Sequence, residues 1–153
     1  MTGTRALVLD ANILVSAVLG TRVSALLDSY ATAVAFFGPD VAYADARRHL
    51  PGLLRRRGID AEDGLGVLTL LEPLVQPVAS RDYEPARSEA MARIARRDAD
   101  DWPVLAVALV LDCPIWTQDQ DFFGAGVPTW TTDRVELYLR NSRSSAAEEP
   151  DRR

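Results

Sequence analysis

Three aspartates stand at the predicted ends of buried elements, which makes them candidates for chemistry. Asp10 follows the apolar run 6–9, whose four consecutive apolar residues predict a strand buried on both faces of a parallel sheet. Asp119 follows a similar strand at 114–117, and Asp101 begins the apolar helix that leads into that strand. In open parallel sheets, ligands bind at the carboxyl ends of the strands, where the intervening helices also begin. We therefore expect the three carboxylates to share one crevice.

Each candidate acid also has a purely structural interpretation. Asp10 and Asp101 each suit the N-cap of the helix that follows, and Asp119 and Asp121 suit turns. Asp45, in the middle of a predicted helix, suits a solvated surface. For all of them to serve only structure at the same edge of one sheet would require a coincidence, so we favour a site.

Carboxylates that meet in this way need a cation. Two of them about 4.5 Å apart repel by roughly 4 kcal/mol at an effective dielectric constant of about 20, so a cluster must take up protons, splay apart or bind a positive ion. Hard divalent ions such as Mg²⁺ and Mn²⁺ prefer oxygen ligands. Such an ion lowers the pKa of a bound water and stabilises charge on a phosphoryl group. The composition of the site thus predicts metal-assisted phosphodiester hydrolysis.

Side-chain chemistry argues against several other classes of protein. The chain has one cysteine, Cys113, and one histidine, His49, and all 17 of its basic residues are arginine. Zinc sites and Ser–His–Asp or Cys–His catalysis would each depend on that single imidazole. A phosphoacceptor receiver domain needs a lysine, and a haloacid-dehalogenase-like phosphatase needs an aspartate where this chain has Asn12. The net charge of −5 is unusual for a nucleic-acid binder, but acids gathered in one pocket would account for it, and arginine suits bidentate phosphate contacts.

The length and patterning predict one domain. At 153 residues and 48% hydrophobic composition, the chain suits a single core, which we place at residues 1–140, followed by a disordered tail at 141–153. No apolar run reaches the roughly 20 residues of a membrane span, and the N-terminus lacks a signal-peptide pattern, so we expect a cytoplasmic protein with no membrane partner.

Strands and helices alternate along the chain, which predicts an α/β domain of three layers, α/β/α, with a central parallel sheet of four or five strands. Right-handed crossovers place the carboxyl ends of all these strands on one edge. After the first strand, the expected strands are 33–37, 114–117 and 128–131, and 75–79 is expected as a short edge strand or a connector. The expected helices are 13–20, 23–30, 40–50, 52–57, 60–73, 84–97, 102–111 and 133–140. Asp40 and Asp60 are the expected N-caps of the helices that they begin.

Taken together, these motifs resemble those of the PIN-domain family, which includes the ribonuclease toxins of VapBC-type toxin–antitoxin pairs. The resemblance covers about residues 5–135. It rests on Leu9-Asp10-Ala-Asn12-Ile-Leu-Val, on Asp45 five residues before Leu50, on Arg97-Asp-Ala-Asp-Asp101-Trp-Pro-Val-Leu-Ala-Val-Ala, and on Trp116-Thr117-Gln-Asp119-Gln-Asp121-Phe122. It implies Mg²⁺- or Mn²⁺-dependent RNA cleavage, with metal ligation by Asp10, Asp45, Asp101 and Asp119, a supporting catalytic acid in Asp121, and orienting roles for Asn12 and Thr117.

One position departs from the family pattern. The second acid of such proteins is usually Glu, and Asp45 is one methylene shorter, which leaves direct and water-mediated contact with the ion both open. In the expected mechanism, a metal-activated water oriented by Asp119 or Asp121 attacks the scissile phosphate in line. The expected contacts to the RNA backbone come from the basic residues Arg47, Arg48, Arg55, Arg56 and Arg57, which fit a solvated helix face equally well.

The resemblance also implies partners. It implies a homodimer, an RNA substrate and, for a toxin, a cognate antitoxin protein. The alternative function is a PIN-like module that binds RNA or protein without cutting. Metal-dependent thermal stabilisation without cleavage of any RNA would favour that alternative.

Overall fold

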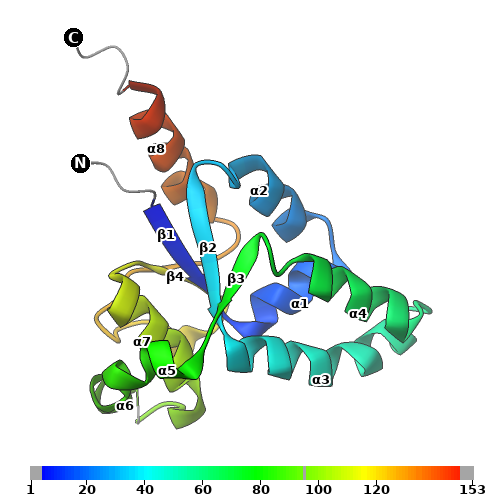
Figure 1. The fold of residues 1–153 in the computed structure, drawn as a ribbon, viewed down its shortest axis with the longest axis horizontal. Helices are drawn as coiled ribbons and strands as arrows, with labels where there is room; N and C mark the ends of the chain where they lie inside the picture. The colour runs from blue at the N-terminus through cyan, green and yellow to red at the C-terminus, as the bar shows by residue number, and fades with distance from the viewer. Residues whose placement is uncertain (1–4, 95, 149–153) are drawn as a thin grey trace.

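The computed structural model describes residues 5–94 and 96–148, and within them a five-stranded parallel sheet lies between two layers of helices (Figure 1). The strands are β1 (Arg5–Leu9), β2 (Val34–Pro39), β3 (Val75–Val78), β4 (Ile115–Trp116) and β5 (Thr129–Trp130), in the spatial order β3-β2-β1-β4-β5. The α-helices are α1 (Ala11–Leu19), α2 (Arg22–Tyr30), α3 (Asp40–Arg56), α4 (Ala61–Leu70), α5 (Ser80–Tyr83), α6 (Arg87–Ile94), α7 (Trp102–Leu111) and α8 (Val135–Glu148). The predicted three-layer α/β architecture is confirmed.

Successive side chains of the central strands enter two separate cores. In β1, Leu7 and Leu9 pack with residues of α1 to α4 and α8, whereas Val8 packs with residues of α5, α6 and α7 on the other face. In β4, Trp116 joins the first core and Ile115 the second. This is the two-residue period of a strand, and because both faces are covered, β1 reads as a continuous apolar run.

The order of the strands creates a switch point beside β1. From β1 the chain moves outward through β2 to β3 at one edge, then returns to β4 on the other side of β1. Leu9 pairs with Trp116 in the β1–β4 register, so the next residues, Asp10 and Thr117, leave the sheet as neighbours. The carboxyl edge at such a switch point is where open α/β sheets bind ligands.

Helix α3 corrects the predicted break at Pro51. The sequence predicts two helices, 40–50 and 52–57, but α3 is one helix of 17 residues with Pro51 inside it. An interior proline costs a helix about 3 kcal/mol. Leu50 and Leu54, on either side of it, are fully buried, and each buried leucine contributes about 1.5–3 kcal/mol. Asp40 is also the first helical residue instead of the predicted cap, with Pro39 in the cap position.

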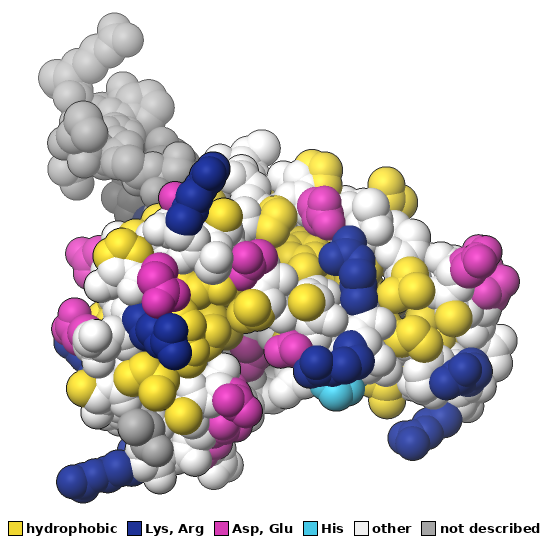
Figure 2. Space-filling view, turned by 60° about the horizontal axis from the view of Figure 1, so that its bottom comes forward, with side chains coloured by type: hydrophobic (Ala, Val, Ile, Leu, Met, Phe, Trp, Pro, Cys, Tyr) yellow, Lys and Arg dark blue, Asp and Glu magenta, His cyan; other side chains and the backbone are white. Residues whose placement is uncertain are grey.

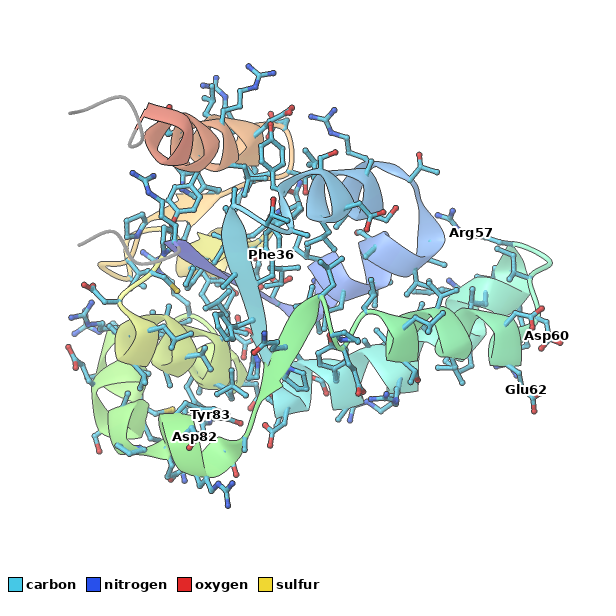
Figure 3. All side chains as sticks on the ribbon, turned by 45° about the horizontal axis from the view of Figure 1, so that its top comes forward. Phe36, Arg57, Asp60, Glu62, Asp82 and Tyr83 are labelled. Atoms are coloured by element: carbon cyan, nitrogen blue, oxygen red, sulfur yellow. The ribbon has the colours of Figure 1, made fainter. Side chains whose placement is uncertain are left out.

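Helices α3 and α4 form a hairpin that projects from the sheet, with Arg57, Asp60 and Glu62 at its far end (Figure 3). Asp60 caps α4 as predicted, because its side chain accepts a hydrogen bond of 3.0 Å from the Glu62 N–H. Both helices of the hairpin also contact α1, and the arginines at the end of α3 lie on this hairpin.

Two other segments differ from the predicted helices and tail. The expected helix 84–97 is a 3₁₀ turn, Glu84–Ala86, followed by α6, and residue 95 lies outside the described part. Residues 141–148, predicted as a disordered tail, continue α8, while 149–153 lie outside the described residues. Among the described residues no single helix has the length and apolar character needed to cross a membrane; α1 and α2 meet that test only together, across a 102° bend.

Candidate active site

Asp10 joins β1, α1 and β4 through both of its carboxylate oxygens. Oδ1 accepts a hydrogen bond of 3.0 Å from the Ile13 N–H, so Asp10 is the N-cap of α1, and Oδ2 accepts a hydrogen bond from the Thr117 hydroxyl. The residue is only 6% exposed. Burial raises the pKa of Asp10, an effect larger than the opposing effect of the hydrogen bonds from Thr117 and Ile13. The structural interpretation of Asp10 is therefore correct, and it coexists with a position in the pocket described below.

Thr117 connects Asp10 to the acids that follow β4. The fully buried Thr117 hydroxyl donates to Asp10 and accepts a hydrogen bond of 2.9 Å from the Asp119 N–H. Asp119 Oδ1 in turn accepts a hydrogen bond of 2.9 Å from the Asp121 N–H and caps the 3₁₀ turn Gln120–Phe122. This chain of hydrogen bonds fixes the position of one acid relative to the next.

Asp101 has no capping role, although the sequence allows one. It occupies the N-cap position of α7, but its side chain makes no capping hydrogen bond. Asp98 caps the preceding 3₁₀ turn, Ala99–Asp101, by accepting a hydrogen bond of 3.0 Å from the Asp100 N–H. Among the described residues, the buried Oδ2 atom of Asp101 has no hydrogen-bond partner. The structural interpretation is thus wrong for this residue, and an unpaired buried oxygen of this kind calls for an explanation.

The electrostatic environment of Asp101 is dominated by other acids. Burial is the largest cause that raises the pKa of Asp101 to about 7, and repulsion by neighbouring carboxylates adds to it; these belong to Asp98, Asp119, Asp10 and Asp121. A carboxylate in this position holds a proton near neutral pH unless a cation replaces it.

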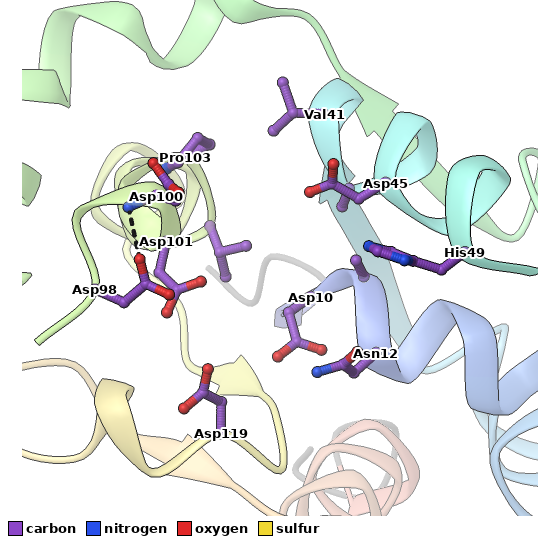
Figure 4. Close-up of a pocket in the computed structure, with 13 residues that line it drawn as sticks. Asp10, Asn12, Val41, Asp45, His49, Asp98, Asp100, Asp101, Pro103 and Asp119 are labelled. Atoms are coloured by element: carbon purple, nitrogen blue, oxygen red, sulfur yellow. Dashed lines mark hydrogen bonds between the residues drawn. The ribbon is translucent and has the colours of Figure 1, made fainter.

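Several of these acids line a pocket of about 240 Å³ at the carboxyl edge of the sheet. Its acidic lining consists of Asp10, Asp45, Asp98, Asp100, Asp101 and Asp119. In Figure 4 the carboxylates of Asp10, Asp101 and Asp119 face the same space, with Asp98 next to Asp101. Carboxylate oxygens of Asp98, Asp101 and Asp121 lie within 4.8 Å of one another. The predicted convergence of Asp10, Asp101 and Asp119 at one edge is therefore observed.

Asp45 and the arginines of α3 flank this pocket to different degrees. Asp45 lines it from the side opposite Asp101 (Figure 4) and forms an ion pair of 2.7 Å with Arg48. Arg47 contacts α4 instead, through an ion pair of 2.9 Å with Glu72. The last turn of α3 and its C-cap carry three more arginines, Arg55, Arg56 and Arg57. Arg57 donates a hydrogen bond of 3.4 Å to the Leu19 carbonyl. The structure therefore does not bring Arg47 to the pocket, and Arg48 reaches it only as the partner of Asp45.

Asn12 also lines the pocket, but its side chain makes no hydrogen bond to the acids within the described part of the chain. No hydrogen bond among the described residues therefore supports the orienting role predicted for Asn12, whereas the hydrogen bond from Thr117 to Asp10 supports the one predicted for Thr117. The catalytic and metal-binding roles of the individual residues stay predictions.

Asp98 is a member of the cluster that sequence reasoning did not single out. The signal was present, because Asp98 begins a segment with three acids in four residues immediately before an apolar helix. Choosing among these acids requires the path of the backbone through the 3₁₀ turn, which directs Asp98 and Asp101 toward Asp121.

Two arginines that precede this segment hold the loop after Asp119, and sequence reasoning did not identify this role. Arg97 Nη1 donates a hydrogen bond of 3.1 Å to the Asp121 carbonyl, and Arg93 Nη1 donates one of 3.2 Å to the Ala125 carbonyl. Gly124 and Gly126 have positive φ angles, and added Cβ atoms would lie 3.0 and 2.6 Å from the Arg97 and Arg93 guanidinium nitrogens. The glycines therefore allow the arginines to approach the backbone, and that pair of glycines was the available sequence signal.

The donor set fits a hard divalent cation. All the clustered ligand atoms are carboxylate oxygens, the type that Mg²⁺ and Mn²⁺ prefer, and the unpaired Oδ2 atom of Asp101 is one of the oxygens that such an ion would satisfy. The N-terminus of α7 also lies beside the cluster, and its partial positive charge favours ionised ligands there.

Comparison with known proteins agrees with this arrangement. A family model described as a PIN domain matches residues 8–140, a span that contains every acid of the cluster. No match was found among curated proteins. The family match and the acid cluster together support a nuclease kind of hydrolase activity. The chain belongs to the PIN domain family.

Proposed function

We propose that the chain is a divalent-metal-dependent endoribonuclease that hydrolyses RNA phosphodiester bonds with Mg²⁺ or Mn²⁺. The observation that carries the proposal is the crowding of carboxylates around Asp101. Asp98 and Asp121 bring oxygens within 4.8 Å, and Asp101 keeps one buried oxygen without a hydrogen-bond partner among the described residues. Membership of the PIN domain family supports the nuclease activity, while RNA as the substrate and the identity of the ion belong to the proposal.

Some residues of the cluster would bind the ion, and others orient the side chains that bind it. The ion would be held by carboxylates of Asp10, Asp98, Asp101, Asp119 and Asp121. When bound, it would supply positive charge that stabilises the phosphoryl oxygens and lowers the pKa of a water. Thr117 positions Asp10 relative to Asp119 through its hydroxyl, and the oxygen of Asp119 that does not cap the turn can orient the attacking water. Asp101, with a pKa of about 7, would give up its proton to act as a ligand of such an ion.

Asp45 contributes from the opposite wall of the pocket. Its carboxylate is paired with Arg48 and belongs neither to the group of oxygens within 4.8 Å nor to the charges that raise the pKa of Asp101. We infer that Asp45 contacts the ion through water, as its short side chain suggests.

The test is cleavage of a labelled RNA pool by the wild-type protein in Mg²⁺, in Mn²⁺ and in EDTA. Asp10→Asn and Asp101→Asn remove a ligand charge at constant shape, and both should abolish metal-dependent cleavage while the protein still unfolds cooperatively. Asp28→Asn, an exposed position on α2, is the matched control and should cleave normally. Undiminished cleavage by Asp101→Asn would end this proposal.

A module that binds RNA or protein without cutting is the second candidate, because Asp45 replaces the longer acid usual in the family and is already paired with Arg48. Metal ions would then raise the melting temperature of the wild-type protein, but no RNA pool would be cut. Cleavage in Mg²⁺ or Mn²⁺ that EDTA abolishes would exclude this alternative.

The biological setting is also a proposal. The resemblance of the motif blocks to toxin ribonucleases leads us to propose a homodimeric, cytoplasmic toxin with a cognate antitoxin. Expression of the wild-type protein should arrest growth, Asp101→Asn should not, and co-expression of the antitoxin from a neighbouring reading frame should restore growth. Size-exclusion chromatography tests the dimer, and growth unaffected by the cleaving wild-type protein would contradict the toxin role.

A further inference from the structure

A second hollow adjoins the acid pocket, between α1 and α3. It has a volume of about 420 Å³ and is lined by Asn12 and Val15 of α1 and by His49, Gly52, Leu53 and Arg56 of α3. Asn12 and His49 line the acid pocket as well, so the two cavities meet at these two side chains. Figure 4 places both on the side of the acid pocket that lies across from Asp98 and Asp101. An extended ligand that occupies one cavity can therefore continue into the other.

The lining of this hollow differs from that of the acid pocket, because none of the described residues that form it is an aspartate or a glutamate. Val15 and Leu53 are partly buried and give it an apolar wall, and Gly52 leaves the space beside that wall open. Asn12 and His49 offer hydrogen-bonding groups where the two cavities meet. An apolar surface with a few polar groups, in a volume within the range of about 300–1,000 Å³, is typical of sites for small organic groups.

Arg56 carries a positive charge that no ion pair neutralises within the described residues. Arg47 and Arg48 are paired with Glu72 and Asp45, whereas Arg56 has no hydrogen-bond or ion-pair partner among the described residues. Figure 2 shows arginine side chains (dark blue) beside the chain's one histidine (cyan), with acidic side chains (magenta) close by. A phosphate that meets Arg56 gains a bidentate partner just outside the acidic region that repels it.

We propose that this hollow, the flanking subsite, holds the nucleotide next to the scissile phosphate of a single-stranded RNA. Its base lies against Val15 and Leu53, and its phosphate contacts Arg56. The proposal rests on the proposed nuclease function and adds to it the position of the substrate outside the acid pocket. It also explains how a chain with a net charge of −5 receives a polyanion, since the cation lies on the path and not in the pocket.

The first test fills the subsite. An added Cβ atom at Gly52 would meet no atom within 4 Å, and the same holds for Gly66 on α4, so both positions accept a larger side chain. Affinity for a fluorescent single-stranded RNA oligonucleotide is measured in the Asp101→Asn background, which separates binding from cleavage. Gly52→Leu should weaken binding several-fold, and Gly66→Leu should not. Equal affinities of the two variants would overturn the subsite.

The second test measures charge. Arg56→Gln removes one proposed phosphate contact, so the slope of log K against log salt should fall in magnitude by about 0.7 for a single strand. Arg81→Gln, an exposed position on α5 that lines neither cavity, is the control and should leave the slope unchanged. Equal slopes for the two variants would count against the subsite. If these differences appear while the wild-type protein cuts no RNA, the nuclease proposal fails, and the hollow is an RNA-binding site with no scissile phosphate beside it.

Discussion

Removing the charge of Asp101 should make the metal-free protein more stable, although it should destroy the proposed activity. Asp101 is partly buried, surrounded by four other acids, and has a pKa raised to about 7 by burial and by their repulsion. Above that pH the wild-type protein must hold an ionised carboxylate where a neutral one is preferred. Asp101→Asn keeps the shape of the side chain and removes the charge, so it relieves this cost.

The size of the effect follows from the pKa. A change from 3.8 to about 7 is a difference of about 3, and each pKa unit corresponds to 1.36 kcal/mol, which gives about 4 kcal/mol as an unscreened maximum. Solvent reaches part of this carboxylate and screens its repulsion, so we expect about 1–2 kcal/mol at pH 8. For a chain of this length, each kcal/mol shifts the melting temperature by about 2–4 °C.

The dependence on pH has a definite sign. Below about pH 4 the carboxyl group is protonated in both the folded and the unfolded chain, and it contributes nothing. Between about pH 4 and 7 the unfolded chain releases the proton while the folded protein keeps it, so the wild-type free energy of unfolding falls as the pH rises. The advantage of Asp101→Asn should therefore grow from pH 5 to pH 8.

The assay is thermal unfolding in EDTA at pH 5 and pH 8, repeated with Mg²⁺. Asp28→Asn, which removes an exposed charge on α2, is the control and should follow the wild-type protein. Mg²⁺ should stabilise the wild-type protein more than Asp101→Asn, because the ion relieves the same repulsion that the substitution removes. If Asp101→Asn is less stable than the wild-type protein at pH 8 in EDTA, or if the difference does not change with pH, the reasoning is refuted.

Two further predictions concern stability. Thr117→Val removes the hydroxyl that donates to Asp10, so we expect the free energy of unfolding in urea to fall by about 1–3 kcal/mol and RNA cleavage to decrease. Thr117→Ser keeps the hydroxyl and should keep most of the stability and most of the cleavage. Equal losses in the Ser and Val variants would contradict the hydrogen-bonding role. An alanine Cβ at Gly64 would lie 2.3 Å from Leu54 Cδ1, so Gly64→Ala should lower the free energy of unfolding by about 1–2 kcal/mol. At Gly66 an added Cβ would meet no described atom within 4 Å, so Gly66→Ala should raise it by about 0.5–1 kcal/mol in the same measurement. Shifts of the same sign would contradict the packing of α4 on α3.

The sheet and the location of the site could be predicted because both depend on local patterns. The apolar run of β1 identifies a strand covered on both faces, and the alternation of strands and helices places all the strand ends on one edge. Asp10 and Asp119 follow two of those strands directly, so their convergence needs no knowledge of side-chain packing. The pairing of Leu9 with Trp116 then makes Asp10 and Thr117 neighbours, a consequence of strand order that local patterns do not contain.

The features that could not be predicted depend on contacts between distant segments. Pro51 indicates a break, but burial of Leu50 and Leu54 against the rest of the core keeps α3 continuous. Residues 141–148 have no apolar period, yet they extend α8, whose Val135 and Leu139 are anchored in the core. At Pro51 tertiary burial therefore outweighs a local signal, and at 141–148 the backbone continues a helix that is anchored further towards the N-terminus.

The acids of the pocket also show that a structural role and a functional role do not exclude each other. Asp10 uses both oxygens in hydrogen bonds that cap α1 and bind Thr117, and Asp119 uses one oxygen to cap a turn. Each carboxylate oxygen has more than one lone pair, so a capping carboxylate can still bind an ion. Asp101 differs because one of its buried oxygens is bound to nothing within the described chain. Spacing along the sequence identifies the acids that converge, but only the hydrogen bonds of the folded chain identify Asp101 as the acid whose buried oxygen is left for a proton or a cation.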